Sequence, residues 1–270
     1  MISPHPADVL GAIVAAAFRR VEDARGGRSV QTLERAAARR HPRGQAFRQA
    51  LADGPSPRII AECKRRSPSR GVLRRDYDPA AIARSYSAAG AAAISVLTEP
   101  SFFDGDLSHL KAVREAVPTP LLRKDFIVSE YQLLEAREAG ADGVLLIARA
   151  LPGAALIDLH AAAEAHGLAA LVEVHEPAEL ERALAAGAGI IGVNSRNLRT
   201  LEVDREGLGG LIHEIPDDVV AVAESGLKDP ADVAELQALG YDAFLIGERF
   251  MIEVDPGAGL RAFTRAGAHG

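Results

Sequence analysis

Short apolar runs and alanine-rich stretches alternate along most of this chain. The apolar runs are rich in β-branched residues and nearly continuous in hydrophobicity, which is typical of parallel strands that are covered on both faces. Such runs cover Arg58–Lys64, Ala93–Leu97, Pro120–Phe126, Gly143–Ala148, Ala169–Val174, Ile190–Asn194, Val219–Ala223 and Ala243–Ile246. The pattern therefore predicts eight strands.

The stretches between these runs are predicted to be helices, among them Pro79–Ala89, Ser129–Ala139, Pro177–Ala186 and Pro230–Leu239. Several are followed by a glycine and a small residue, the usual way for a helix to end before the chain turns into a strand. Eight strands that alternate with helices indicate a (β/α)8 barrel. A doubly wound open sheet is the alternative, but no Gly-x-Gly-x-x-Gly pattern follows the first strand.

The first 50 residues are predicted to be helical. Apolar residues recur there at spacings of three and four, at Val9, Leu10, Ile13, Val14, Ala17, Phe18 and Val21. Asp8 is the expected cap of this helix, and Gly26-Gly27 its expected end. Further helices are expected over Thr32–Arg40 and Gln45–Ala52. We therefore expect one barrel domain over residues 1–270, with residues 1–55 as a helical N-terminal extension.

Composition and charge exclude several classes of protein. With 48% hydrophobic and 25% charged residues, the chain has ordinary globular usage, so neither a disordered nor a fibrous protein fits. The formal charge of −6 argues against nucleic-acid or membrane-surface binding, which needs a basic face. A single cysteine, Cys63, excludes an internal disulfide and a cysteine-cluster zinc site.

The sequence near the N-terminus predicts neither a membrane-spanning segment nor a signal peptide. The apolar run from Val9 to Phe18 is too short to cross a bilayer. Arginines follow this run rather than precede it, so it does not have the order of a signal peptide. We expect a cytoplasmic protein without nucleic-acid or membrane partners.

Charged side chains gather at the predicted strand ends, where (β/α)8 barrels build their active sites. Side chains alternate along a strand, so Glu62 and Lys64 share a face while Cys63 points the other way. The other strand ends carry Lys124, Glu173, Asn194 and Glu224. Unpaired charges in a barrel mouth are costly to desolvate, so the lysines and glutamates are expected to pair. We expect their pKa values to move toward the working pH, as acid–base catalysis needs.

A second signal points to phosphate. Ser225-Gly226 and Gly247-Glu248 follow the seventh and eighth strands, where barrels commonly bind phosphate with backbone N–H groups. The carboxylate of Glu248 repels a phosphate, so only its backbone is expected to face one, with the side chain in solvent. The basic loop Lys64–Gly71 is open to two interpretations, a solvated loop or a lid that brings Ser67 to an anionic substrate.

Six strings carry a resemblance to a known family: IIAECKRRSPSRG, ISVLTEPSFFDGDLSHL, PLLRKDFIVSEYQLLEAREAGADGVLLI, LVEVHE, IIGVNSRNL and VAESGL. They follow one another between Arg58 and Met251, and the ordered set is far less expected by chance than any one string. In these motifs the chain resembles the indole-3-glycerol-phosphate synthase family. The resemblance implies conversion of 1-(2-carboxyphenylamino)-1-deoxyribulose 5-phosphate to indole-3-glycerol phosphate, carbon dioxide and water. It also implies a phosphorylated small-molecule substrate and no metal or organic cofactor.

The resemblance further implies roles for individual residues. Lys124 is expected as the general acid on the ribulose carbonyl, and Lys64 as a contact of the substrate carboxylate and a proton donor in the dehydration. Their basic partners are Glu173, the usual candidate for the base, and Glu62. The residues expected to hold the ribulose hydroxyls, the carboxylate and the lysines are Asn194, Arg196, Glu224 and Ser225.

Two further groups follow from the same resemblance. The phosphate is expected against Ser67, Gly226, Gly247 and the backbone of Glu248. The anthranilate ring is expected between Phe103, Phe126 and Leu198. His175 shares a strand face with Glu173, but no partner for it is visible in the sequence, so a rim or structural histidine is the favoured interpretation.

Two alternatives remain open. A phosphoribosylanthranilate isomerase-like enzyme typically uses a cysteine and an aspartate, and the outward orientation expected of Cys63 counts against it. A catalytically silent barrel predicts that the strand-end charges are lost, whereas the expected lysines and glutamates are all present. A monomer or a weak homo-oligomer is expected.

Overall fold

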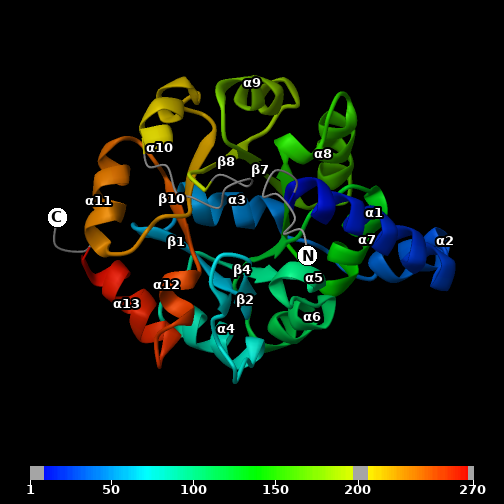
Figure 1. The fold of residues 1–270 in the computed structure, drawn as a ribbon, viewed down its shortest axis with the longest axis horizontal. Helices are drawn as coiled ribbons and strands as arrows, with labels where there is room; N and C mark the ends of the chain where they lie inside the picture. Colours follow the sequence, from blue (N-terminus) through cyan, green and yellow to red (C-terminus); the bar gives the residue numbers. More distant parts are fainter. Residues whose placement is uncertain (1–8, 197–205, 267–270) are drawn as a thin grey trace, which may run out of the picture.

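A closed barrel of eight parallel strands forms the centre of the computed structural model, which describes residues 9–196 and 206–266 (Figure 1). The strands follow one another around the barrel in chain order, and β1 closes it by pairing with both β4 and β10. Their bounds are β1 Arg58–Cys63, β4 Ala93–Leu97, β5 Leu121–Lys124, β6 Gly143–Ile147, β7 Ala169–Val174, β8 Ile190–Asn194, β9 Val220–Glu224 and β10 Ala243–Ile246. The predicted (β/α)8 barrel is confirmed, and the predicted strand ends differ by no more than two residues.

Alternation along each strand divides the core into two parts. On β1, Ile60 packs with the barrel interior, whereas Ile59, Ala61 and Cys63 belong to the layer between the strands and the surrounding helices. All four side chains are fully buried. Strands covered on both faces in this way read as continuous apolar runs, which is why the sequence pattern was clear.

Helices surround the barrel and connect its strands. Several begin with a side-chain cap, such as Asp78, which accepts from the backbone N–H of Ala81, and Asp229, which forms a capping box with Asp232. These connecting helices are α4 Pro79–Ala88, α5 Pro100–Phe103, α6 Leu107–Ala116, α7 Glu130–Ala139, η2 Ala148–Ala150, α8 Ala155–Ala165, α9 Pro177–Ala185, α10 Glu206–Leu211, η3 Ile212–Glu214, α11 Pro230–Ala238, α12 Glu248–Met251 and α13 Pro256–Ala266.

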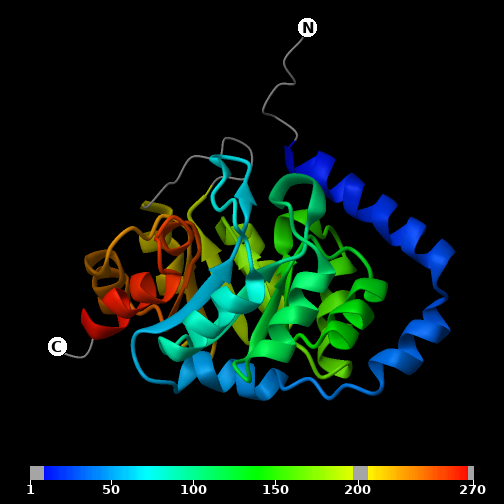
Figure 2. The ribbon, with the colours of Figure 1, turned by 90° about the horizontal axis from the view of Figure 1, so that it is seen from below.

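Three helices precede the barrel: α1 Val9–Gly27, α2 Val30–Ala37 and α3 Gly44–Ala52. Helix α3 lies across the N-terminal end of the barrel, where Phe47 and Leu51 are fully buried (Figure 2). Helix α2 begins two residues earlier than predicted because Ser29 caps it by accepting from the backbone N–H of Thr32. The predicted cap Asp8 lies outside the described residues.

The loop after β1 contains a small hairpin that the sequence pattern did not predict. Its strands are β2 Arg66–Ser67 and β3 Gly71–Val72, and it stands at the C-terminal end of the barrel (Figure 2). Gly71 has φ +70°, a left-handed conformation that glycine adopts without strain. Two-residue strands are too short to leave a hydrophobic period, which explains the omission. None of the helices in the described ranges is long and apolar enough to cross a membrane.

Candidate active site

A cavity of about 620 Å³ opens at the carboxyl ends of the barrel strands. The parallel strands bring their ends together there, so residues as far apart in the sequence as Glu62 and Ile252 line one space. The six charged or amide side chains predicted at strand ends all line it: Glu62, Lys64, Lys124, Glu173, Asn194 and Glu224. The structure thus brings together the whole predicted acid–base set.

Lys124 lies between two glutamates in this cavity. Its Nζ donates to Oε2 of Glu173 at 3.1 Å and to Oε2 of Glu224 at 3.2 Å. Both carboxylate side chains are only 2% exposed. Burial alone lowers the pKa of Lys124, but the charges of Glu224 and Glu173 outweigh it, and the net pKa is raised. Lys124 therefore stays cationic at neutral pH.

The two glutamates around this lysine titrate differently. Burial raises the pKa of Glu224 to about 7, and the nearby charge of Glu173 adds to the shift. For Glu173 burial also favours the neutral form, but Lys124 and His175 outweigh it, so its pKa is lowered. Two carboxylates whose pKa values are pushed apart are a mark of acid–base sites. The expected move of the pKa toward the working pH thus holds for Glu224 but not for Lys124 or Glu173.

A second lysine–glutamate pair lines the same cavity. The Nζ of Lys64 lies 2.5 Å from Oε1 of Glu62, so the expected shared face of β1 brings them into direct contact. Glycine makes room for the carboxylates here. A Cβ built on Gly247 would lie 2.3 Å from Oε1 of Glu62, and one on Gly192 would lie 2.1 Å from Oε1 of Glu224. A larger residue at either position would displace the carboxylate beside it.

The ends of β9 and β10 form the predicted anion end of the cavity, which is lined by Ser225, Gly226, Gly247 and Glu248. Ser225 has φ +67° and Gly226 has φ +75°, so two successive residues adopt the left-handed conformation. For Ser225 this conformation is strained, and strain of this kind is concentrated at functional sites.

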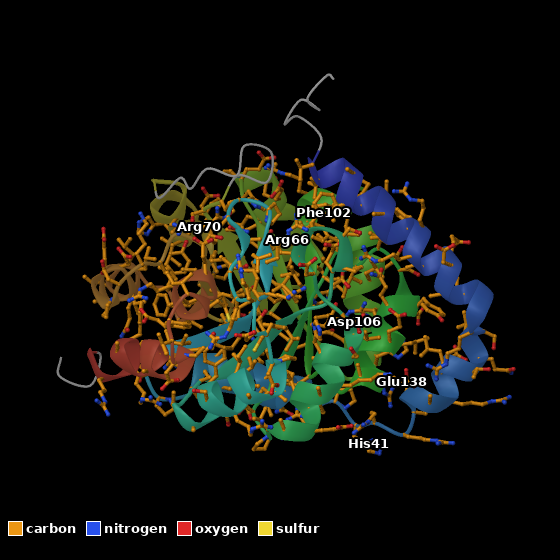
Figure 3. The ribbon with its side chains drawn as sticks, turned by 60° about the horizontal axis from the view of Figure 1, so that its bottom comes forward. His41, Arg66, Arg70, Phe102, Asp106 and Glu138 are labelled. Atoms are coloured by element: carbon orange, nitrogen blue, oxygen red, sulfur yellow. The ribbon has the colours of Figure 1, made fainter. Side chains whose placement is uncertain are left out.

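The side chain of Glu248 differs from the prediction. We expected it in solvent, but it is 23% exposed and its Oε1 lies 2.6 Å from Nε of Arg70. Its Oε2 lies 4.0 Å from Nη2 of Arg196. Figure 3 shows Arg66 and Arg70 on the hairpin at this end of the barrel, whereas His41 lies at the opposite end. Arg70 and Arg196 thus offset the negative charge of Glu248, which would otherwise repel an anion.

Two aromatic rings line the other side of the cavity. Phe103 follows β4 and Phe126 follows β5, and their ring centroids are 6.5 Å apart. Both rings also border a smaller cavity of about 80 Å³ under α1, and Ser67 lies on that one rather than on the larger cavity. Ser67 is buried in the hairpin, where its Oγ accepts from the backbone N–H of Arg70. The predicted ring residue Leu198 lies outside the described residues.

Sequence reasoning missed Asp125, which lines the cavity directly after Lys124. Its Oδ1 accepts from Arg20 on α1, and its Oδ2 accepts from Thr98 and Arg123. Arg20 also donates to the fully buried Glu99, at 2.9 Å. The N-terminal helix is thus tied to the rim by buried charges. The charged run Arg123-Lys124-Asp125 was the available signal, but the partner on α1 is 105 positions away.

This fold and site define a class: (β/α)8-barrel enzymes that carry acid–base groups at the carboxyl ends of their strands. A family model described as indole-3-glycerol phosphate synthase matches residues 10–263. A relative from Nocardioides sp. with that name is 53% identical over 230 residues, covering 81% of this chain and 88% of the relative. One from Leptothrix cholodnii, named likewise, is 46% identical over 258 residues, covering 94% and 98%. The chain therefore belongs to the indole-3-glycerol phosphate synthase family.

Among solved structures, thiamine phosphate pyrophosphorylase from Pyrococcus furiosus is similar with a TM-score of 0.62. That likeness covers 83% of this chain and all of the other chain, at 18% sequence identity. At this identity it supports the barrel fold alone.

Proposed function

We propose that this protein converts 1-(2-carboxyphenylamino)-1-deoxyribulose 5-phosphate to indole-3-glycerol phosphate, carbon dioxide and water, the ring-closing step of tryptophan biosynthesis. The observation that carries the proposal is the position of Lys124, whose ammonium is held at 3.1 Å and 3.2 Å by two buried carboxylates on the cavity wall. Membership of the synthase family supports the same reaction.

Lys124 is the general acid of ring closure in this proposal. The aromatic carbon that bears the carboxylate attacks the ribulose carbonyl, which breaks aromaticity and places negative charge on the carbonyl oxygen. An ammonium that is already aimed at that oxygen stabilises the charge and supplies the proton without reorganisation. Glu173 and Glu224 hold the lysine in place, and a Glu224 with a pKa of about 7 is suited to return a proton to it.

The second half of the reaction uses the other lysine–glutamate pair. Carbon dioxide leaves, and the bonding electrons that it releases restore the aromatic ring. Lys64 then gives a proton to the departing hydroxide, and Glu173 takes a proton from the carbon next to the nitrogen, so a double bond forms and water is lost. Glu62, 2.5 Å from Lys64, orients that ammonium.

Different parts of the cavity bind the phosphate, the ring and the ribulose group of the substrate. The phosphate lies against the backbone of Gly226, Gly247 and Glu248, with Arg70 near the same end. A contact between the phosphate and Ser67, which the sequence predicted, requires the β2–β3 hairpin to move toward the larger cavity. The anthranilate ring packs between Phe103 and Phe126. Asn194, Arg196, Glu224 and Ser225 hold the ribulose hydroxyls and the carboxylate. Anchoring both ends of the substrate brings the two reacting carbons together.

The test is turnover of the carboxyphenylamino-deoxyribulose phosphate, followed by the fluorescence of the indole product. Lys124→Ala is expected to lower kcat by about 10³-fold, within the range typical for loss of a general acid, with KM nearly unchanged. The matched control is Lys111→Ala on the outer surface of α6, where the lysine is 47% exposed. Product formation at the wild-type rate by Lys124→Ala refutes the assigned acid, and no product from the wild type refutes the proposed reaction.

The isomerase-like alternative needs a cysteine in the active site, and none of the described residues that line this cavity is a cysteine. Cys63 is fully buried between the barrel and its helices, where burial raises the pKa of its thiol far above the usual range. We further propose that the protein acts in the cytoplasm and is a monomer or a weak homo-oligomer. Light scattering coupled to size-exclusion chromatography tests the oligomeric state.

A further inference from the structure

His175 directly follows β7, two residues after Glu173, and its side chain is only 6% exposed. Its ring lies between two carboxylates. Nε2 is 3.7 Å from Oε1 of Glu173, and Nδ1 is 3.4 Å from Oε2 of Glu179 on α9. The partner that the sequence left unidentified is therefore a glutamate four residues farther along, on the next helix.

The Glu173 carboxylate has two differently placed oxygens. Oε2 accepts from Lys124, whereas Oε1 is buried and has no hydrogen-bond partner among the described residues. Both ring nitrogens of His175 are buried as well; Nδ1 faces Glu179, whereas Nε2 forms no hydrogen bond with a described residue. Buried polar atoms without partners are costly, so a shift of less than about 1 Å that joined Nε2 to Oε1 would satisfy both groups.

Glu179 fixes the far side of the histidine. Its Oε2 accepts from the backbone N–H of His175 at 2.8 Å, and its Oε1 accepts from Nε of Arg149 at 2.5 Å. Arg149 also lies 3.1 Å from Glu176 at the start of α9. The groups that face His175 are therefore the carboxylates of Glu173 and Glu179, with Lys124, Arg149 and Glu176 behind them.

The charges around the ring favour its cationic form. Burial lowers the pKa of His175, but Glu179 and Glu173 outweigh this effect, and the net pKa is raised. In return, the cation contributes to lowering the pKa of Glu173. A positive ring between two carboxylates thus keeps both of them ionised.

We propose that His175 is a positioning residue that holds the Glu173 carboxylate at the oxygen that Lys124 does not contact and links it to Glu179. The inference rests on the proposed role of Glu173 as the base. A base acts only when it is ionised and aimed at the proton that it removes, and His175 serves both requirements without contacting the substrate. Arg149, Glu179 and His175 then form one chain that ends at the catalytic carboxylate.

The kinetic test compares His175→Gln and His175→Ala with the wild type over pH. Both variants are expected to lower kcat about tenfold on the acid side with KM within twofold, because loss of the nearby cation raises the pKa of Glu173 and lowers its ionised fraction there. The acidic limb of the kcat profile is expected to move to higher pH. Glutamine keeps an N–H donor, so it should retain more activity than alanine at high pH while sharing the shifted limb.

His160→Gln is the matched control, since His160 is a buried histidine on α8 that does not line the cavity. It is expected to leave the pH profile unchanged. An unshifted acidic limb in the His175 variants, a loss confined to KM, or an equal loss in His160→Gln overturns the proposal.

A measurement without turnover separates this proposal from the proposed function. The titration of His175, assigned through its backbone in an NMR spectrum of the whole protein, is expected to show a lower pKa in Glu173→Gln and in Glu179→Gln than in the wild type. An identical titration in all three proteins overturns the contact. If the wild type makes no indole product, the proposed function fails, and this titration still decides whether His175 and Glu173 are coupled.

Discussion

Adding a single methyl group at Gly192 should disable the site without replacing any charged residue. In Gly192→Ala the new Cβ would lie 2.1 Å from Oε1 of Glu224, so the carboxylate must retreat by roughly 1 Å to reach an ordinary contact. That movement breaks the 3.2 Å hydrogen bond to Lys124. A displacement of about 1 Å in a catalytic group costs about 10²-fold in rate, equivalent to about 2.7 kcal/mol. We therefore expect kcat to fall about 100-fold.

The assay is steady-state turnover with product fluorescence, together with urea unfolding to measure stability. Gly143→Ala is the matched control, because that strand glycine would place its Cβ at an ordinary 3.4 Å from its nearest neighbours. The double variant Gly192→Ala with Glu224→Asp shortens the carboxylate side chain and should recover part of the loss from Gly192→Ala. Equal effects of the two glycine variants on kcat, or a fall in stability large enough to explain the lost activity, would refute the reasoning.

Two further predictions concern stability. Arg20→Met leaves the buried carboxylates of Glu99 and Asp125 without their partner on α1 and should lower the free energy of unfolding by about 3 kcal/mol. The control Arg19→Met, at an exposed position, should change it by less than about 0.5 kcal/mol. Equal effects of the two variants in urea unfolding contradict the assigned ion pairs. The pKa of Glu224 is raised from 4.5 to about 7, so between these values the folded state binds a proton that the unfolded state has lost. As the pH rises from about 4.5 to 7, the wild type should therefore lose on the order of 3 kcal/mol of stability relative to Glu224→Gln. Parallel stability curves of the two proteins over that window rule this out.

Local patterns were sufficient for the strands and for the orientation of side chains on them. The alternation on β1 predicted that Glu62 and Lys64 share a face and that Cys63 points away, and the structure has this arrangement. A two-residue period needs only neighbouring positions to be recognised, so it survives in the sequence. The hairpin β2–β3 has strands of two residues each, too short to show any period.

Other features of the site depend on residues that are distant in the chain. No local pattern indicates that Arg20 reaches Asp125, 105 positions away, or that Arg70 in the loop after β1 pairs with Glu248 after β10, the strand that closes the barrel against β1. The expectation that the Glu248 side chain points to solvent was wrong for this reason. Charge alone identifies a group that needs a partner, and only the packed fold decides which partner is near.

The sequence by itself determined the barrel, the end of the barrel that carries the chemistry, and which lysines and glutamates lie there. Strand periodicity and the alternation of strands with helices can be recognised from neighbouring positions, and the chain direction then defines the carboxyl end of each strand. The tertiary structure alone decided that Lys124 lies between Glu173 and Glu224, that their pKa values separate, and that His175 stands behind the base. Those properties arise from burial and from distances of 3 to 4 Å between segments that the chain brings together only when the barrel closes.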